Sequence, residues 1–347
     1  MPSPAEQLLG QTLIGGWRVI ERVEMPSVAT GGYFSVCYLV ESETGTRAFL
    51  KALDFSKAFE SSDPARVLQA MTEAYNFERD LLAKCRDRSM SRVVRAIDDG
   101  SIRIGGTSAD GVVQYLIFEL ADRDVRLHLA LADQVDLAWK LRSLHHIATG
   151  LRQLHSAGIA HQDLKPSNVL VFEQNTSKVG DLGRAVYDGR SGPCDGLQCA
   201  GDPSYAPAEL LYGYLDSDWK TRRIGCDLYL LGSMVVFFFT GFSATSLLMS
   251  ELHESLRWQN WGGSFEEALP YLRDAFGRVG DSFSRQIDDD KLREELNAIV
   301  RQLCEPDPKR RGIPPTIRGI SSPYSLERYI SKFDLLARRA ELNFSGR

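Results

Sequence analysis

The pattern of apolar residues divides the chain into a strand-rich first third and a mainly helical remainder. Residues 17–55 are rich in β-branched and aromatic side chains, with turn sequences at 30–32 and 42–45, and this predicts successive antiparallel strands. Three further β-like runs follow, separated by glycine-containing turns: 93–97, 102–104 and 112–119. We therefore predict a small antiparallel sheet that is complete near residue 120.

Helical periodicity appears once within this first region and then dominates. Asp63-Pro64 opens a stretch to Cys85 in which apolar residues recur near the helical period, so one helix is expected after the third strand. Beyond Asp124 helices are expected at 137–156, 229–239, 265–276 and 292–304. This order predicts an α+β fold of two lobes, with a ligand cleft between the small sheet and the larger helical lobe.

Four segments are expected from this division. They are an N-terminal extension at 1–13, a first lobe at 14–118, a connecting hinge with the second lobe at 119–323, and a helical tail at 324–347 packed on the second lobe.

Composition narrows the functional classes. The 347 residues are 43% hydrophobic and 25% charged, which is typical of a soluble globular protein, and the net charge of −5 provides no basic field for nucleic acid. The N-terminus has no leader pattern, and the most apolar run, 228–239, is too short to span a bilayer, so a buried core helix and no membrane contact are expected.

Cysteine usage indicates a reducing cytoplasmic compartment. The six cysteines are scattered without the short repeated spacing of zinc sites. Cys194 and Cys199 lie close together, and two incidental thiols are favoured over a redox pair.

The densest chemical signal is the run His161-Gln162-Asp163-Leu164-Lys165-Pro166-Ser167-Asn168, which lies between a predicted helix and a β-like run at 169–171. A second acid follows in Asp181-Leu182-Gly183. Phosphoryl transfer requires cations that bridge the phosphates and a group that orients the attacking hydroxyl. An isolated loop Asp or Asn is usually a turn former or a cap, but this many ordered positions favour a catalytic site.

These residues resemble the eukaryotic-like protein kinase family, whose catalytic loop is H-R-D-x-x-x-x-N and whose metal motif is D-F-G. The resemblance covers roughly residues 14–315. It implies the two-lobed kinase fold, ATP with Mg²⁺ (or Mn²⁺ in its place), and a protein substrate. It assigns Asp163 as the base and Asn168 and Asp181 as Mg²⁺ ligands, and Lys165 favours serine and threonine hydroxyls as acceptors.

The resemblance also assigns a nucleotide site. Lys51, on the third predicted strand, would contact the α- and β-phosphates and pair with Glu78, for which Glu73 is the alternative. The glycine-rich loop is the weakest match: Gly32 is retained in the preferred register, Gly31 in the alternative one, and Ser35 stands where glycine is usual. The other assigned positions are Val36, Cys37, Phe118, Glu119, Ala121, Leu170 and Asp124, the last of which could also be a helix cap.

Two further positions match structural residues of the family. The segment 201–209 resembles the end of an activation segment, and its Glu209 would pair with Arg311. Asp227 resembles the acid that braces the catalytic loop, and a buried carboxylate there requires a partner.

Four positions depart from the family pattern. Gln162 replaces the arginine that pairs with an activation-segment phosphate, so we predict activity without that phosphate. Asp202 replaces a threonine; it could pair with Lys165, but it adds negative charge near Asp163. Phe49 replaces a small alanine and could narrow the nucleotide pocket, whereas Leu182 for phenylalanine is a mild exchange.

Two alternatives stay open at this point. A pseudokinase scaffold is favoured by Phe49 and the poor glycine loop, although Lys51, Asp163, Asn168 and Asp181 are all retained. A small-molecule kinase of the aminoglycoside or choline type would lack the activation-segment ending at 205–209. The substrate and the oligomeric state are not encoded in any motif.

Overall fold

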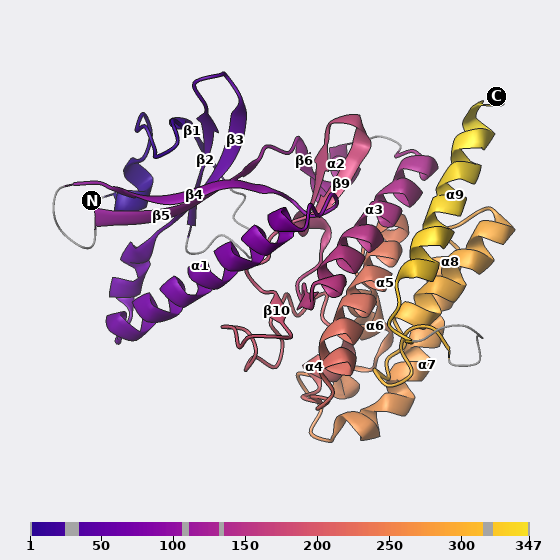
Figure 1. The fold of residues 1–347 in the computed structure, drawn as a ribbon. Helices are drawn as coiled ribbons and strands as arrows, with labels where there is room; N and C mark the ends of the chain where they lie inside the picture. Colours follow the sequence, from indigo (N-terminus) through magenta and orange to yellow (C-terminus); the bar gives the residue numbers. More distant parts are fainter. Residues whose placement is uncertain (1, 25–34, 106–110, 132–134, 315–321, 346–347) are drawn as a thin grey trace. The chain divides into compact units, whose positions relative to one another are not determined.

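The computed structural model of the chain describes residues 2–24, 35–105, 111–131, 135–314 and 322–345. The chain forms two compact units, Met1–Asp122 and Arg123–Arg347 (Figure 1). The first contains the sheet and the second is mainly helical, so the predicted α+β class with a small sheet lobe and a larger helical lobe is confirmed.

The first unit is built on a five-stranded antiparallel sheet in the order β1-β2-β3-β5-β4. The hairpin between β2 and β3 turns at Ser42–Thr46, where Gly45 adopts φ +81°. This places Lys51 in the middle of β3, opposite Cys37 on one side and Leu116 on the other. The strands are β1 Arg18–Val23, β2 Ser35–Glu41, β3 Arg47–Leu53, β4 Ala96–Arg103 and β5 Val112–Glu119.

Strand β4 corrects the prediction of two separate runs at 93–97 and 102–104. It is one strand with a bulge between Ala96 and Asp98, and its pairing with β5 continues through the polar residues between the two runs. Gly100 lies directly against the ring of Tyr115, where a Cβ would be only 2.6 Å from the Tyr115 hydroxyl oxygen. Because β4 is an edge strand, partly exposed polar residues are tolerated there, and hydrophobic periodicity alone could not show that the two predicted runs are continuous.

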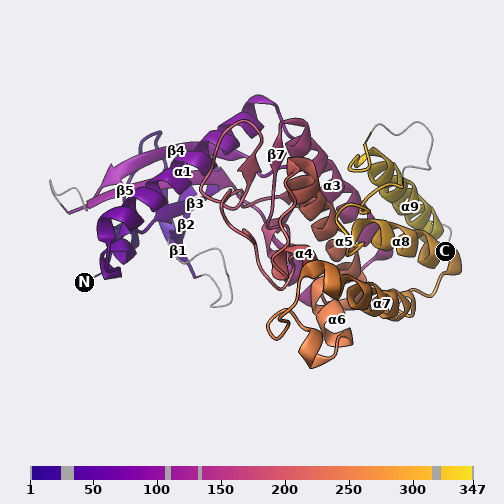
Figure 2. The same cartoon turned by 90° about the horizontal axis from the view of Figure 1, so that it is seen from below.

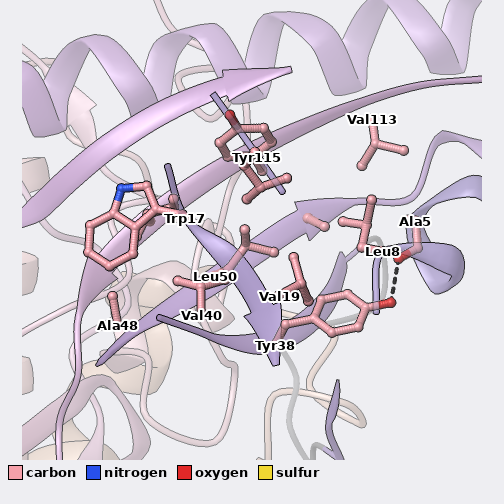
Figure 3. Close-up of a cluster of buried hydrophobic side chains, with 13 residues drawn as sticks. Ala5, Leu8, Trp17, Val19, Tyr38, Val40, Ala48, Leu50, Val113 and Tyr115 are labelled. Carbon is pink, nitrogen blue, oxygen red and sulfur yellow. Dashed lines mark hydrogen bonds between the residues drawn. The ribbon is translucent and has the colours of Figure 1, made fainter. Parts of the chain in front are cut away.

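Residues before β1 belong to the core of the first unit. A short 3₁₀ helix, η1 Pro4–Gln7, begins with a capping box between Ser3 and Glu6. Ala5, Leu8 and Leu13 are buried against the sheet, and the Tyr38 hydroxyl donates to the Ala5 carbonyl at 2.7 Å (Figure 3). The segment expected to be an extension is thus packed into the cluster that also holds Trp17 and Tyr115.

Helix α1 Pro64–Asp87 forms where the periodicity predicts it, after the short helix η2 Phe55–Glu60. The Asp63 side chain accepts from Arg66 N as the N-cap, and Pro64 occupies the first turn. The Tyr75 hydroxyl donates to the Tyr115 carbonyl at 3.2 Å, which ties the buried face of the helix to β5. Glu78 lies on this buried face.

The second unit consists of helices with short strand pairs. Helix α3 has the predicted bounds, but α5 begins earlier than residue 229 and α7 continues to Ser284 past Pro270. A polar residue hides the start of α5, because Asp227 is buried through hydrogen bonds and not through apolar contact. The helices are α2 Val125–Leu131, α3 Leu137–Ser156, α4 Ala208–Leu211, α5 Gly225–Thr240, α6 Ala244–Glu251, α7 Phe265–Ser284, α8 Asp290–Leu303 and α9 Glu327–Ser345.

Helix α5, with the π-helical turn Lys220–Ile224 before it, is the buried central helix of this unit. Lys220–Thr240 is long and apolar enough to cross a membrane by length and composition alone. However, 83% of its most apolar 18-residue stretch is buried inside the protein, as expected of a core helix. Gly232 permits the close approach of α8, since a Cβ there would lie 2.8 Å from Leu303 Cβ.

Helix α9 packs lengthwise against α3 (Figures 1 and 2). Arg142 on α3 pairs with Asp334 at 2.6 Å and with Glu341 at 2.7 Å. Phe333 and Ala337 are completely buried, so the C-terminal helix is an integral part of the second unit.

Candidate active site

Short strands hold both ends of the segment His161–Asn168. Before it, β7 Ile159–Ala160 pairs with β10 Val186–Tyr187; after it, β8 Val169–Phe172 pairs with β6 Arg123–Asp124 and β9 Thr176–Val179. The segment ends in a 3₁₀ turn, η4 Pro166–Asn168. All of its residues except Ser167 are buried, so the polar side chains within it are fixed by hydrogen bonds.

The carboxylate of Asp163 is held from three directions. Lys165 Nζ lies 3.2 Å from Oδ2, Asn168 Nδ2 donates to Oδ2 at 3.1 Å, and the Asp202 backbone N–H donates to Oδ1 at 2.8 Å. Burial raises the pKa of Asp163 above the usual value of an aspartate, although Lys165 and the Asp202 N–H oppose the shift. The site therefore presents an oriented carboxylate with increased basicity.

Asp227 braces this segment from α5. Its Oδ2 accepts from His161 N at 2.7 Å and from His155 Nε2 at 2.8 Å, and its Oδ1 accepts from Gln162 N at 2.8 Å. Burial alone would raise the pKa of Asp227, but the contacts with His155, His161 and Gln162 hold it below its usual value. The expectation that this buried acid has partners is confirmed.

Asp181 lies just after β9. Its φ of +58° and that of Gln162, +65°, are in the left-handed region that non-glycine residues rarely adopt. Gly180 connects the two turns, because its N–H donates to the Asn168 carbonyl at 2.8 Å and its carbonyl lies 2.9 Å from His161 Nε2. Such strained residues cluster at functional sites.

Two residues near Asp163 have the chemistry that suits a hard cation. Asn168 would contribute an amide oxygen and Asp181 a carboxylate, which are the ligand types that Mg²⁺ prefers. Within the described ranges no group of three or more His, Cys, Asp or Glu side chains could hold a metal. Mg²⁺ usually binds through one or two carboxylates together with substrate phosphates, so these residues fit an ion that binds with a nucleotide.

In the first unit, Lys51 is paired with the predicted glutamate. Its Nζ lies 3.3 Å from both carboxylate oxygens of Glu78, while Glu73 accepts from Gln69 Nε2 at 2.8 Å instead. The two paired side chains are 21% and 10% exposed. The structure thus decides between the two candidate glutamates.

The glycines of the predicted nucleotide loop, Gly31 and Gly32, lie outside the described residues. Ser35 begins β2, and Cys37 pairs with Lys51 across the β2–β3 ladder. Val36 packs against the core cluster that holds Tyr38. Because side chains alternate along a strand, Cys37 lies on the other face of β2, the face that Lys51 shares, and Val36 does not.

The remaining predicted nucleotide residues lie in or next to the strands β5, β6 and β8. Phe118 and Glu119 end β5, just before Ala121, and Glu119 Oε1 accepts from Arg95 N at 2.8 Å. In the second unit Asp124 pairs with Leu170 between β6 and β8. The Asp124 carboxylate accepts a hydrogen bond from Leu127 N at 2.7 Å, so Asp124 caps the start of helix α2, as the alternative interpretation of this residue expected.

The predicted pair of Glu209 and Arg311 is present and buried. Two parallel bonds join the side chains, Nη1 to Oε1 at 2.6 Å and Nη2 to Oε2 at 2.8 Å. Although burial opposes it, Glu209 raises the pKa of Arg311. This bidentate contact fixes the end of the segment 201–209, which resembles the end of an activation segment.

Two contacts of the site were not predicted. Gly201 passes so close to the segment that a Cβ would lie 2.8 Å from Asp163 Oδ1, so a side chain is excluded there. Arg223 donates from Nη1 to Gln162 Oε1 at 3.3 Å. Gly201 is signalled only by its place in the 201–209 motif, and no local pattern indicates Arg223.

Comparison with known proteins agrees with this geometry. The model of the family described as protein kinase domain matches residues 24–320, so the chain belongs to the protein kinase family. The chain is 29% identical over 147 residues to the inactive serine/threonine-protein kinase PLK5 of Mus musculus, a match that covers 41% of this chain and 23% of that protein. It is 28% identical over 159 residues to mitogen-activated protein kinase 5 of Arabidopsis thaliana, covering 46% and 38%.

A third relative is the dual serine/threonine and tyrosine protein kinase of Strongylocentrotus purpuratus, 31% identical over 147 residues, covering 41% of this chain and 14% of that protein. The chain thus spans well under half the length of each of these relatives.

Proposed function

We propose that the protein transfers the γ-phosphoryl group of ATP to serine or threonine hydroxyls of a protein. The observation that carries the proposal is the Asp163 carboxylate, which is buried, more basic than usual and oriented by Lys165, Asn168 and the Asp202 N–H. Such a group is suited to align a hydroxyl and to accept its proton.

The other residues would act on the nucleotide. Asn168 and Asp181 would hold Mg²⁺, which neutralises charge on the β- and γ-phosphates when bound. Lys51, oriented by Glu78 at 3.3 Å, would contact the α- and β-phosphates. These roles follow from the family and from the donor chemistry described above.

Lys165 supports serine and threonine as acceptors. Its Nζ lies between two acids, 3.2 Å from Asp163 and 3.6 Å from Asp202. Asp202 thus acts as a positioning residue that takes the place of the threonine usual in the family. The names of two relatives include serine/threonine kinase activity, and one of these names includes tyrosine as well.

A nucleotide-binding scaffold without transfer is the second candidate. Phe49 shares the strand face of Lys51, where the family has a smaller residue, and one relative is named as inactive. Incubation with labelled ATP, Mg²⁺ and a generic protein mixture, followed by phosphoamino-acid analysis, separates the candidates. The kinase proposal requires label on phosphoserine or phosphothreonine, whereas ATP binding without labelled product supports the scaffold.

A small-molecule kinase is disfavoured by the buried pair of Glu209 and Arg311, which fixes a segment suited to a peptide acceptor. Labelled products of aminoglycosides or choline, with none on protein, would reverse this preference.

A further inference from the structure

Strand β3 is apolar on both faces, but only one face is completely buried. On that face Leu50 belongs to the core cluster with Tyr38 and Ile117, and all three residues are 0% exposed (Figure 3). Side chains alternate along a strand, so Phe49 and Lys51 share the other face, where both are half-buried. This second face therefore carries apolar surface that the described residues cover only in part.

Three large apolar side chains form a row on this face. The strand register pairs Phe49 with Leu39 on β2 and with Phe118 on β5. Residues paired directly across a ladder point to the same side of the sheet, with Cβ atoms about 5 Å apart. All three are half-buried, so the row offers a continuous apolar surface to a ligand.

The row lies beside the ion pair of Lys51 and Glu78. Phe49 and Lys51 are two positions apart on β3, which corresponds to about 7 Å along the strand. Lys51, oriented by Glu78 at 3.3 Å, is the cation that would contact the phosphates. A ligand that joins a flat apolar ring system to an anionic group fits both features, and a nucleoside triphosphate is such a ligand.

A base on this row is recognised through its face more than through its edge. Phe49 carries an aromatic ring where the family has the methyl group of alanine, so a base would lie about 3.5–4 Å farther from the strand. Glu119 donates its N–H to the Arg95 carbonyl at 3.1 Å, and its carboxylate accepts from Arg95 N at 2.8 Å. Both of these Glu119 groups are therefore already engaged and do not read the edge of a base.

We infer that Phe49 makes the nucleotide site tolerant of base identity, so that both ATP and GTP serve as phosphoryl donors. Stacking on an aromatic ring stabilises any base, because every base has a π-face, whereas hydrogen bonds at the edge distinguish one base from another. Phe49 is thus a residue that determines donor specificity. Because Lys51 is to hold the phosphates, this inference rests on the proposed function.

The chemistry of transfer is the same for either donor. With GTP, the bond between the γ-phosphorus and the β–γ bridging oxygen breaks and GDP leaves. The acceptor hydroxyl oxygen bonds to the γ-phosphorus, and its proton passes to Asp163.

Equilibrium binding of ATP and of GTP to the full chain, with Mg²⁺ and without an acceptor protein, tests the inference. For wild type the two Kd values should agree within about threefold, because stacking is nearly independent of the base. Phe49→Ala lets a base approach the strand, and it should separate the two values by about tenfold or more in favour of ATP. Phe49→Tyr keeps the ring and should bind both nucleotides equally.

Two further variants guard the measurement against a loss of folding. Phe59→Ala is the matched control, because Phe59 belongs to η2 of the same unit and is 56% exposed; it should bind both nucleotides as wild type does. Phe49→Val also removes the ring but has a side chain that suits a strand, so it replaces Phe49→Ala if circular dichroism shows that variant to be unfolded.

Each outcome decides the matter. Wild type that binds ATP at least tenfold more tightly than GTP overturns the inference, as does binding of neither nucleotide, or a ratio of Kd values that is unchanged when the ring is removed. Transfer is assayed separately with γ-labelled ATP and γ-labelled GTP. Labelled protein from ATP alone overturns base tolerance and leaves the proposed function intact, whereas equal binding of both nucleotides without labelled protein supports base tolerance and contradicts the proposed function.

Discussion

The ion pair on the sheet of the first unit and the ion pair behind the catalytic segment of the second unit differ in burial and geometry. Lys51 and Glu78 meet at 3.3 Å with the lysine side chain 21% exposed, whereas Arg311 and Glu209 meet at 2.6 and 2.8 Å with at most 4% exposure. The shorter, bidentate and almost completely buried pair should cost more stability when one partner is lost than the longer and slightly more exposed pair. Variants in the two regions should therefore separate folding from chemistry.

The largest effect on stability is expected in the second unit. Arg311→Met leaves Glu209 buried without its counter-charge, and it should lower the free energy of unfolding by about 3–5 kcal/mol. Urea unfolding followed by circular dichroism measures the change. The double variant Glu209→Gln/Arg311→Met should recover part of the loss; a single variant as stable as wild type would contradict the comparison.

In the first unit the expected effect is on transfer. Glu78→Gln should reduce the transfer rate about 10²-fold by misplacing Lys51, with a smaller loss of stability than Arg311→Met. Glu73→Gln is the control on the same helix and should transfer normally, because Glu73 contacts Gln69 and not Lys51. An equal loss of transfer rate in both variants would show that the rate depends on the negative charge of the helix and not on the pair of Glu78 with Lys51.

Two acids at the catalytic segment, Asp163 within it and Asp227 against it on α5, should respond to pH with opposite signs. The lowered pKa of Asp227 contributes stability above its unfolded pKa near 4, which is lost as the pH falls through the folded value. The raised pKa of Asp163 contributes stability below that pH, which is lost as the pH rises through the folded value. Asp227→Asn should therefore be destabilised most at neutral pH, and Asp163→Asn should not be; unfolding curves from pH 3 to 7 measure both.

The smallest effect is expected from removal of phosphate. Phosphatase treatment should leave the initial transfer rate nearly unchanged, because Gln162 occupies the family's arginine position and Arg223 is already bound to Gln162 and to the Asp195 carbonyl. An inactive treated enzyme that regains activity on rephosphorylation would refute this expectation.

Hydrophobic periodicity and sequence motifs predicted those features of the fold and site that depend on residues close together in the sequence. Helix α3 has the predicted bounds because its apolar positions recur at the helical period. The sequence motif also predicted that Asp163, Lys165 and Asn168 belong to one site, and the three side chains are in contact. The continuity of β4 between its two predicted runs and the start of α5 were not predicted, because polar residues there are held by hydrogen bonds or tolerated at an edge. The contact between Gln162 and Arg223 could not be predicted, because the two residues are 61 positions apart in the sequence and no periodicity encodes their contact.

The most direct test of the account is the initial rate of phosphoryl transfer by Asp163→Asn, compared with wild type and with Asp290→Asn. Asp290 is an exposed acid at the start of α8 in the same unit. The account predicts label on serine or threonine for wild type and Asp290→Asn, and a loss of roughly 10²–10⁴-fold for Asp163→Asn without a lower melting temperature. Transfer by Asp163→Asn at the wild-type rate, or no transfer by wild type, would contradict it.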